Sequence, residues 1–417
     1  MDRPHSEGAE TGPRRAGVQG RMSARPFRVL HITPYFAPAF CYGGPPRSIL
    51  GLCRGLQRAG IDVEVFTTTA NGPVELPASP PAGDRYEGVP VHYFPLGVPR
   101  RLFGARGLRA ALDVGLRGYD VVHVHGLWTQ PGWVGAHRAR RGGVPYVISP
   151  RGMLDDWSMS HRPMRKRIAY WGVERRNLTD AAFLHATSSA EALAIRRWAS
   201  DTPVVTLPNG VDLPAAATPD HGRFKRTWGL APGEPLVAFL GRLHVKKRLD
   251  LLAAAFERVR VAHPETHLVI AGPDVGDRRR VEPLFAAAGG RVHWTGELGD
   301  ALKWPLLAEA AALVMCSDSE NFGLSVLEAM AAATPVVVTQ TCPWEEVEAA
   351  GCGFWVPQNA DAIAEALLQV LRAPERARSM GERGRMLARS KYSWDSIAGA
   401  MADQYRRVAA RAGRKRE

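Results

Sequence analysis

Cysteine is scarce in this sequence. The chain has 417 residues and five cysteines, which form no C-x-x-C pair and are too few for a disulfide scaffold. It also lacks any run of roughly 18 uncharged apolar residues, the length that a membrane-spanning helix needs. Residues 1–25 have no apolar centre of the kind found in signal peptides. These absences predict a cytosolic protein that does not cross a membrane.

Acidic residues are outnumbered by basic ones. The chain carries 41 Asp and Glu against 54 Lys and Arg, a formal net charge of +13. Such an excess favours an anionic partner, which could be nucleic acid, a phosphorylated small molecule or an anionic membrane surface. The basic residues are scattered along expected helices and tails, without a recognised nucleic-acid-binding module. We therefore predict no nucleic-acid partner.

The chain is too long for one ordinary core, and its pattern divides it in two. We expect a disordered leader at 1–25, an N-terminal domain at 26–210, a C-terminal domain at 211–392 with a linker near 209–227, and a terminal helix with a basic tail at 393–417. The terminal helix could pack on either domain. Short apolar segments alternate with helical patterns in both domains, which predicts an α/β fold with parallel sheets covered by helices. Two such domains imply a central cleft.

The expected elements are placed by apolar periodicity and by flanking Gly, Pro and Asn. Strands are expected at 27–34, 63–69, 89–94, 120–126, 144–150, 182–187, 203–211, 235–242, 266–274, 291–296, 311–317 and 335–339. Helices are expected at 48–58, 249–263, 281–288, 301–310, 324–333 and 393–411. In open α/β sheets, ligands bind beyond the carboxyl ends of the strands, so the polar residues at those ends are the candidate site.

Two carboxylates, Glu320 and Glu328, flank the start of the helix expected at 324–333. The glycine at 323 lets backbone N–H groups approach a ligand, and free amides at a helix start favour phosphate. Glu328 could accept hydrogen bonds from a vicinal diol such as a ribose, which leaves Glu320 for another polyol. The alternative is that both acids simply complement the helix dipole.

A basic cluster follows the strand expected at 235–242. It contains Arg242, Lys246, Lys247 and Arg248, and a guanidinium with an ammonium can clamp a diphosphate. The alternative is a solvated face, which suits Lys246 and Arg248 better than the other two. Cations beside a diol-binding acid together indicate a nucleoside diphosphate.

The first domain offers weaker signals at its strand ends. Gly43 and Gly44 occupy the loop after the first strand, where backbone can approach a phosphate or a sugar. We expect His123 and His125 to alternate sides of their strand, so that only one of them faces the cleft, with His123 in the core. Arg151 and Asn209 are candidate acceptor-side or cleft residues. Arg151 could instead pair with Asp155 or Asp156, and Asn209 with Gly210 could instead form the interdomain turn.

Several of these motifs resemble those of a known protein family. GRLHVKKRLDLL, GELGD, SENFGLSVLEAMAAATPVVVT and LPNGVDL resemble the signature of family 4 retaining glycosyltransferases of the GT-B fold, over most of residues 27–396. In that fold, two Rossmann-like domains enclose a nucleotide sugar. The stretches VHGLW, SPRGML and HATSSAEALAIRR further resemble a branch associated with exopolysaccharide and other cell-surface glycan assembly.

The resemblance implies roles for individual residues. Arg242 and Lys247 would bind the donor diphosphate and Glu328 its ribose. Glu320 would contact donor-sugar hydroxyls, Gly43 and Gly44 would lie near the phosphates, and His125 would approach the sugar. The loop would support the donor through Asn321, Phe322, Gly323 and Leu324. The sequence departs from the family at Arg248, where the family often has glycine, so it leaves open which residue of 246–248 contacts phosphate.

The resemblance also implies a chemistry and its partners. Cations would stabilise the departing diphosphate, and retention would follow a front-face route in which Glu320 is not a nucleophile. Catalytic roles thus fall to Glu320, His125, Arg242 and Lys247. No Asp-x-Asp triplet accompanies these clusters, so no metal or other cofactor is predicted. The acceptor would be a saccharide or a lipid-linked saccharide.

Residues 161–177 raise the question of membrane contact. This stretch mixes six Lys and Arg with Tyr170 and Trp171 at helical spacing. It could dock on anionic headgroups at the inner face of the cytoplasmic membrane, or its aromatics could pack inward while its charges are solvated.

Other functional classes remain open. An NAD-dependent oxidoreductase would need a G-x-G-x-x-G loop after the first strand. The sequence there, FAPAFCYGGPPRS, lacks this motif and so disfavours that class. A basic nucleic-acid-binding protein and a non-catalytic relative that binds nucleotide sugars are the further alternatives.

Overall fold

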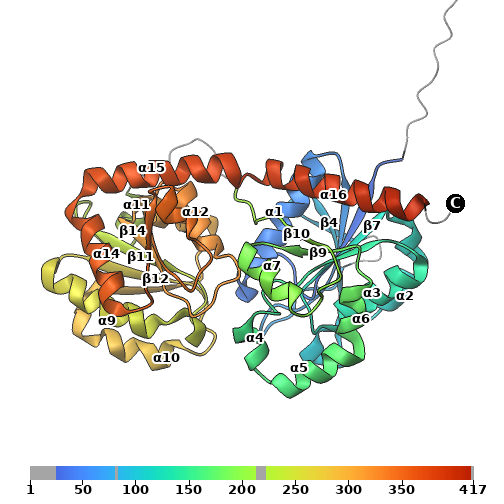
Figure 1. Ribbon diagram of the computed structural model, residues 1–417. Coiled ribbons are helices and arrows are strands. Elements are labelled where there is room, and N and C mark those ends of the chain that lie inside the picture. Colours follow the sequence, from blue (N-terminus) through green and yellow to red (C-terminus); the bar gives the residue numbers. More distant parts are fainter. Residues whose placement is uncertain (1–24, 80–82, 213–221, 415–417) are drawn as a thin grey trace, which may run out of the picture.

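The computed structural model describes residues 25–79, 83–212 and 222–414 (Figure 1). Two α/β halves lie side by side, each built on its own sheet. The expected leader, apart from Arg25, lies outside the described residues, as do 213–221 of the expected linker and the last three residues of the basic tail. No described helix is long and apolar enough to cross a membrane.

The first sheet has the strand order β10-β9-β8-β7-β1-β2-β4-β3. All its neighbours are parallel except the short edge strand β3. Its strands are β1 (Arg28–Ile32), β2 (Asp62–Thr68), β3 (Asp84–Tyr86), β4 (Val89–Phe94), β7 (Val121–His125), β8 (Tyr146–Ser149), β9 (Phe183–Ala186) and β10 (Val204–Thr206). A separate hairpin pairs β5 (Leu96–Gly97) with β6 (Gly104–Ala105). Because the chain order reverses between β1 and β7, that gap is the switch point of the sheet.

The second sheet is entirely parallel, with the order β13-β12-β11-β14-β15-β16. Its strands are β11 (Leu236–Leu240), β12 (His267–Ala271), β13 (Val292–Gly296), β14 (Ala312–Met315), β15 (Val336–Thr339) and β16 (Gly353–Val356). This is the Rossmann order 3-2-1-4-5-6, and its switch point lies between β11 and β14. The predicted fold class, two Rossmann-like halves with parallel sheets, is confirmed.

Helices cover both faces of each sheet, because buried parallel strands expose apolar side chains on both sides. In the first half, α1 (Gly44–Arg58) and α16 (Trp394–Arg414) pack on one face. The opposite face is covered by α2 (Leu108–Gly115), α3 (Gln130–Gly142), α6 (Arg175–Thr179) and α7 (Ser189–Arg196). Two short helices, α4 (Asp156–Ser160) and α5 (Pro163–Ala169), lead through the π-helix η4 (Tyr170–Glu174) into α6.

In the second half, one face is covered by α8 (Arg223–Thr227), α11 (Asp300–Glu309), α12 (Leu324–Ala331) and α15 (Pro374–Lys391). The other face is covered by α9 (Leu249–Ala262), α10 (Arg278–Val281) with the 3-10 segment η6 (Glu282–Arg291), and α14 (Ala360–Arg372). The short α13 (Glu346–Ala349) precedes β16. The helix expected at 281–288 is therefore mainly 3-10, and the last residues of the expected linker form α8.

The terminal helix α16 crosses back to pack on the first half, which settles the alternative that the sequence left open (Figure 1). Its first residue, Trp394, lies against three glycines. A Cβ added at Gly51 or Gly210 would come within 2.3 or 2.6 Å of the indole, and one at Gly55 within 2.8 Å of Ala398. Gly210 thus serves packing at the crossing, where Val211 also donates a backbone hydrogen bond to the carbonyl of Tyr392.

Candidate functional site

A cleft lies between the two halves, where the two switch points face each other. Segments that follow β1, β8 and β11, together with the loop between β14 and α12, form its walls. The predicted residues that line it are Gly43, Gly44, Arg151, Asn209, Arg242, Lys247, Glu320, Asn321, Phe322, Gly323, Leu324 and Glu328. The tertiary structure therefore brings together every candidate site residue except His125, and their roles stay predictions.

Glu320 and Lys247 form an ion pair across the floor of the cleft. The Nζ of Lys247 donates to Oε2 of Glu320, and the two side chains are 16% and 19% exposed. Burial alone would raise the pKa of Glu320, but Lys247, Lys246 and Arg242 outweigh it and lower that pKa. Glu320 is thus an ionised acceptor that can receive hydroxyl hydrogen bonds at neutral pH.

Glu328 pairs with a lysine that the sequence analysis missed. Lys303, in α11, places Nζ 2.8 Å from Oε1 of Glu328 and 2.9 Å from Asp300, and its side chain is 6% exposed. A lysine is almost never buried without a partner, and its place in an otherwise apolar helical segment was the available signal. Lys303 holds the Glu328 carboxylate in position at the cleft wall.

The basic cluster divides into residues that face the cleft and one that does not. Lys246 and Lys247 line the cleft. Arg248 is instead bound to Asp250 at 3.0 Å and to Asp318 at 2.9 Å. Its φ of 52° is left-handed, a conformation that suits the glycine often found there in the resembling family. In this structure two ion pairs offset that backbone strain, and Arg248 is not among the residues that line the cleft.

Arg242 reaches from the second half to the glycine loop of the first. A Cβ at Gly43 would lie 3.0 Å from Nε of Arg242, and one at Gly44 would lie 3.1 Å from Leu324. Gly43 also has a φ of 87°. The left-handed φ favours glycine at 43, and at both positions an added Cβ would be tight against a side chain of the other half.

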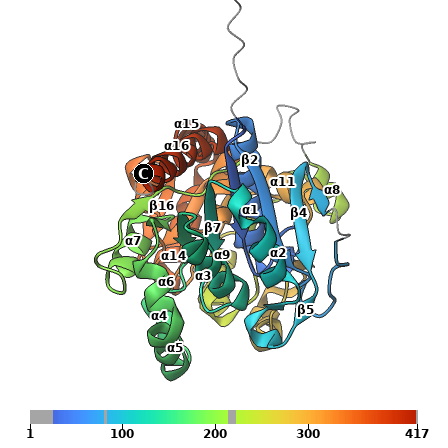
Figure 2. The same ribbon diagram turned by 90° about the vertical axis from the view of Figure 1, so that its right-hand side faces the viewer.

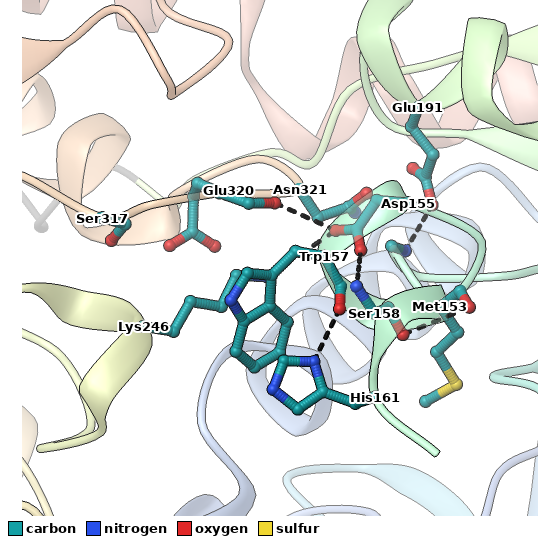
Figure 3. A network of polar contacts seen from close by, with 12 residues as sticks. Met153, Asp155, Trp157, Ser158, His161, Glu191, Lys246, Ser317, Glu320 and Asn321 are labelled. Atoms are coloured by element: carbon teal, nitrogen blue, oxygen red, sulfur yellow. Dashed lines mark hydrogen bonds and ion pairs between the residues drawn. The ribbon is translucent and has the colours of Figure 1, made fainter. Parts of the chain in front are cut away.

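The loop between β14 and α12 contacts the first half directly. The Nδ2 of Asn321 donates to Oγ1 of Thr187 at 2.8 Å, and Ser188 donates to the carbonyl of Asn321 at 3.1 Å. Figure 3 shows Asn321 and Glu320 beside the start of α4, where Asp155 accepts a 3.0 Å hydrogen bond from Ser319 and a 2.5 Å bond from Ser158.

Lys246 adds a second bridge to α4. Its Nζ lies 3.6 Å from Asp155 and 4.4 Å from the ring centre of Trp157. Phe322 is 6% exposed and packs against Trp344 in the core of the second half. The loop 319–324 thus joins the second half to the first along one side of the cleft.

Arg151 binds none of the acids proposed as its alternative partners. Its guanidinium donates to Asn209 Oδ1 at 2.9 Å, to Ser48 Oγ at 3.2 Å and to His125 Nδ1 at 3.1 Å. Asp155 is engaged as described above, and Asp156 binds Arg197. The interpretation of Arg151 as an ion-pair partner of either aspartate is wrong, and Asn209 is placed at the cleft by Arg151.

His125 lies behind the cleft wall, 1% exposed, and reaches the cleft through Arg151. The expectation that His123 and His125 face different ways is wrong, because residues two apart in a strand share a face. Their ring centres are 4.0 Å apart. His123 bonds to Ser149 at 2.7 Å and Tyr405 at 2.6 Å, which confirms its core position.

Three histidines, His31, His123 and His125, bring ring nitrogens within 4.8 Å of one another. His125 is hydrogen-bonded to His31 at 2.8 Å, and Arg151 stands beside both. Burial, with a smaller effect of Arg151, lowers the pKa of His31 to about 3, and burial also lowers the pKa of His123 and His125 far below its usual value. The cluster is a neutral hydrogen-bonded network, and the guanidinium beside it disfavours a bound cation.

Two facing Rossmann-like halves with a polar cleft at their switch points define the architecture of GT-B glycosyltransferases. Comparison with models of known protein families supports the same assignment for both halves. Residues 43–210 match the glycosyl transferase 4-like domain, and residues 220–386 match glycosyl transferases group 1.

Similar proteins cover most of the chain. A D-inositol 3-phosphate glycosyltransferase of Xylanimonas cellulosilytica is 30% identical over 90% of this chain and 94% of its own length. The GDP-mannose:cellobiosyl-diphosphopolyprenol alpha-mannosyltransferase of Komagataeibacter xylinus is 27% identical over 92% and 94%. The protein belongs to the GT4 family of glycosyltransferases.

Solved structures share the fold. Sucrose-phosphate synthase of Thermosynechococcus elongatus aligns with a TM-score of 0.71 and 22% identity, over 92% of this chain and 99% of its own. Anabaena HepE in complex with UDP and glucose aligns with a TM-score of 0.70 and 18% identity, over 90% and 98%.

Proposed function

We propose that the protein is a retaining glycosyltransferase that moves a hexose-type unit from a nucleotide-diphosphate sugar to a saccharide or lipid-linked acceptor in surface glycan assembly. The observation that carries this proposal is the clustering of Arg242, the Lys247–Glu320 pair and the Lys303–Glu328 pair on one wall of the cleft. A relative named for GDP-mannose, and a structural neighbour solved with UDP, support a nucleotide donor of this kind.

The proposed chemistry follows from the charges that the reaction develops. When the bond from the anomeric carbon to the diphosphate oxygen breaks, negative charge grows on the leaving group, and Arg242 with Lys247 stabilises it. Glu328 accepts hydrogen bonds from the ribose diol. Glu320, held ionised, orients the donor-sugar hydroxyls.

Retention is proposed to follow a front-face route. The acceptor hydroxyl oxygen attacks the anomeric carbon on the face that the diphosphate leaves, and a diphosphate oxygen takes the hydroxyl proton. Glu320 is then a positioning group and no glycosyl-enzyme bond forms. NMR of the product made from an α-linked donor tests retention: an α-linked product supports a retaining reaction, and a β-linked product overturns it.

The donor site is tested by calorimetry with UDP, GDP and ADP, without added metal. One diphosphate should bind, and Glu328→Ala should weaken it by ~1 to 3 kcal/mol because the diol loses its acceptor. Arg258→Ala, on the exposed face of α9 and paired there with Asp361, is the matched control and should bind like the wild type. Absence of binding by all three diphosphates would sink the proposed function.

We also propose that the arm formed by α4, α5 and η4 contacts an anionic membrane from the cytoplasmic side. Figure 2 views this arm extending from the body of the molecule. Met164, Ile168 and Trp171, spaced four and three residues apart, are 66%, 70% and 68% exposed. Exposed cations, Arg165 and Arg167 among them, flank this apolar face, a combination that suits headgroup binding. Tyr170, by contrast, packs inward at 7% exposed.

Liposome co-sedimentation tests the arm. Vesicles with anionic lipid should bind the protein, and the Arg165→Glu, Arg167→Glu variant should remain in the supernatant. Arg376→Glu, a charge reversal on the remote helix α15, should still sediment. Equal binding by all three proteins would contradict the membrane contact.

A further inference from the structure

Asp155 is a carboxylate of the first half that contacts the second half with one of its two oxygens. Its Oδ1 accepts the backbone N–H of Ser158 and so caps α4, a role that stays within the first half. Its Oδ2 accepts the hydroxyl of Ser319 at 3.0 Å and lies 3.6 Å from Nζ of Lys246, both from the second half (Figure 3). Capping accounts for Oδ1 only, and the contacts of Oδ2 indicate a second role.

The two partners of Oδ2 are the sequence neighbours of the ion pair in the floor of the cleft. Ser319 immediately precedes Glu320 in the chain. Lys246 likewise precedes Lys247. These neighbours lie in the segments that follow β14 and β11, so a shift of either contact also moves a member of the pair. One oxygen of Asp155 is thus linked to both charged groups through a single residue on each side.

The same two segments are tied to each other inside the second half. The backbone N–H of Asp318 donates to the carbonyl of Lys246 at 2.8 Å, and Arg248 donates to the Asp318 carboxylate at 2.9 Å. The ion pair therefore forms on a unit that is joined without Asp155. What the contact from the first half fixes is the position of that unit relative to the first half.

Aromatic rings brace the first-half side of this contact. The Nζ of Lys246 lies 4.4 Å from the ring centre of Trp157, and the ring of His161 packs on the same indole with ring centres 4.0 Å apart (Figure 3). The side chains of Lys246 and Asp155 are both 21% exposed. Water screens a partly buried charge contact less than an exposed one. The carboxylate and the indole therefore hold one ammonium between them.

The neighbouring Asp156 is an acid with local contacts only. It is exposed, and its carboxylate pairs with Arg197 of the first half at 2.7 Å. Among the described residues it has no hydrogen bond or ion pair with the second half. Two adjacent aspartates at the start of α4 thus differ in whether they reach the cleft floor, and Asp156 provides a matched control.

We infer that Asp155 is a positioning residue for the transfer reaction, which aligns the Lys247–Glu320 pair with the first half through Ser319 and Lys246. The inference rests on the proposed function and adds a residue to it. Misplacing a reacting group by about 1 Å can cost about 10²-fold in rate. The cations and the ribose acceptor proposed for the donor all belong to the second half, so loss of this alignment should lower turnover far more than donor affinity.

Three substitutions separate the roles of the two oxygens. Asp155→Ser keeps a cap for α4, because serine is a good N-cap, but has no second oxygen to offer Ser319. Asp155→Asn keeps the cap and a hydrogen-bonding group toward Ser319, and removes the charge that faces Lys246. Asp156→Ser makes the same change at the adjacent acid, which contacts only the first half.

The full chain is assayed by release of nucleoside diphosphate from UDP-glucose, GDP-mannose and ADP-glucose, with water as the acceptor. Calorimetry gives the Kd of the diphosphate that binds. Asp155→Ser should lower kcat by about tenfold or more, with KM and Kd changed by less than about twofold. Asp155→Asn should lose less, and Asp156→Ser should match the wild type. An acid that only stabilises the fold would not separate kcat from KM in this way.

Two results overturn the inference in this assay. One is a kcat of Asp155→Ser within about twofold of the wild type. The other is a Kd that weakens as much as kcat falls, which would place Asp155 in donor binding. Ser319→Ala tests the route, because it removes the same hydrogen bond from the other side. The effects of Asp155→Ser and Ser319→Ala on kcat should not multiply in the double variant, and full multiplication overturns the inference as well.

Failure of the proposed function gives a different result. If no diphosphate binds to the wild type and no donor is hydrolysed, the proposed function fails, and hydrogen exchange then decides the role of Asp155. Backbone amides of 318–322 should exchange faster in Asp155→Ser than in the wild type and in Asp156→Ser. Unchanged exchange there overturns the positioning role. Circular dichroism checks folding, and should Asp155→Ser not fold, Asp155→Asn and Ser319→Ala decide by the same loss of kcat.

Discussion

The two walls of the cleft are built in opposite ways. On the second-half wall, most of the charged side chains come from two short segments, 242–248 and 320–328, and Lys247 and Lys303 both pair with glutamates of the second segment. On the first-half wall, Ser48, His125 and Asn209 come from three separate elements and all accept hydrogen bonds from the guanidinium of Arg151, which lies on a fourth. Site residues that lie in short local motifs can be predicted from the sequence. Contacts between residues of separate elements are seen only in the tertiary structure.

The largest expected effect tests the ion-paired wall. Lys247→Ala should lower kcat by about 10²- to 10³-fold, because one preorganised group that stabilises developing charge is removed. Glu320 would also remain buried without its counter-charge. Steady-state kinetics with the donor identified by calorimetry measures the effect, and Arg258→Ala is the surface control. A fall of less than threefold would mean that Lys247 is structural.

The next effect concerns how the halves are joined. Gly51→Ala should lower the free energy of unfolding by ~1 to 3 kcal/mol, because its Cβ would lie 2.3 Å from the Trp394 ring. Gly399→Ala lies in the same α16, with nothing within 4 Å of its added Cβ, and should raise stability by roughly 0.5 to 1 kcal/mol. Urea unfolding measures both. Equal shifts would show that the α1–α16 contact adapts freely.

A smaller effect tests the neutral histidine network behind the first-half wall. His31 and His185 have pKa values lowered to about 3, mainly by burial. Below the ordinary histidine pKa of 6.5, the unfolded chain binds protons that the folded chain does not, so stability falls with acidity between pH 6.5 and about 3. The loss should be about 1 kcal/mol per histidine at pH 5.5.

This prediction is measured by urea unfolding at pH 7.5 and 5.5. His31→Asn should reduce the difference between the two pH values, since Asn can still accept a hydrogen bond from His125 without titrating. The exposed His161, replaced by Gln, should leave that difference unchanged. A wild-type stability that does not change between these pH values would contradict the buried neutral network.

The smallest expected effect is at Lys303. Lys303→Met should weaken nucleotide diphosphate binding by about three- to tenfold, because Glu328 loses the partner that fixes its carboxylate. Calorimetry gives the change, and Arg385→Met, exposed on α15, is the control. An unchanged Kd would mean that the backbone of α12 alone positions Glu328.

Much of the fold was readable because each element carries its own periodicity. The expected strands of both sheets fall at β1, β2, β4, β7 to β10 and β11 to β15, while β3, the β5–β6 hairpin and β16 were not foreseen. The left-handed conformation of Arg248 could not be read from residue type, because it depends on the two ion pairs that hold it. Lys303 escaped notice because its partner Glu328 lies 25 residues away, on another helix.

By itself, the sequence determined the two α/β halves, the strand ends that carry polar residues and the identity of the donor-side motifs. These depend on local patterns of apolar residues and on short spacings within one loop and its helix. Only the tertiary structure decided that α16 crosses to the first half, that Arg248 turns away from the cleft, and that Arg151 bonds to Asn209, Ser48 and His125. Those outcomes depend on contacts between residues far apart in the chain, where burial and charge pairing are set by packing.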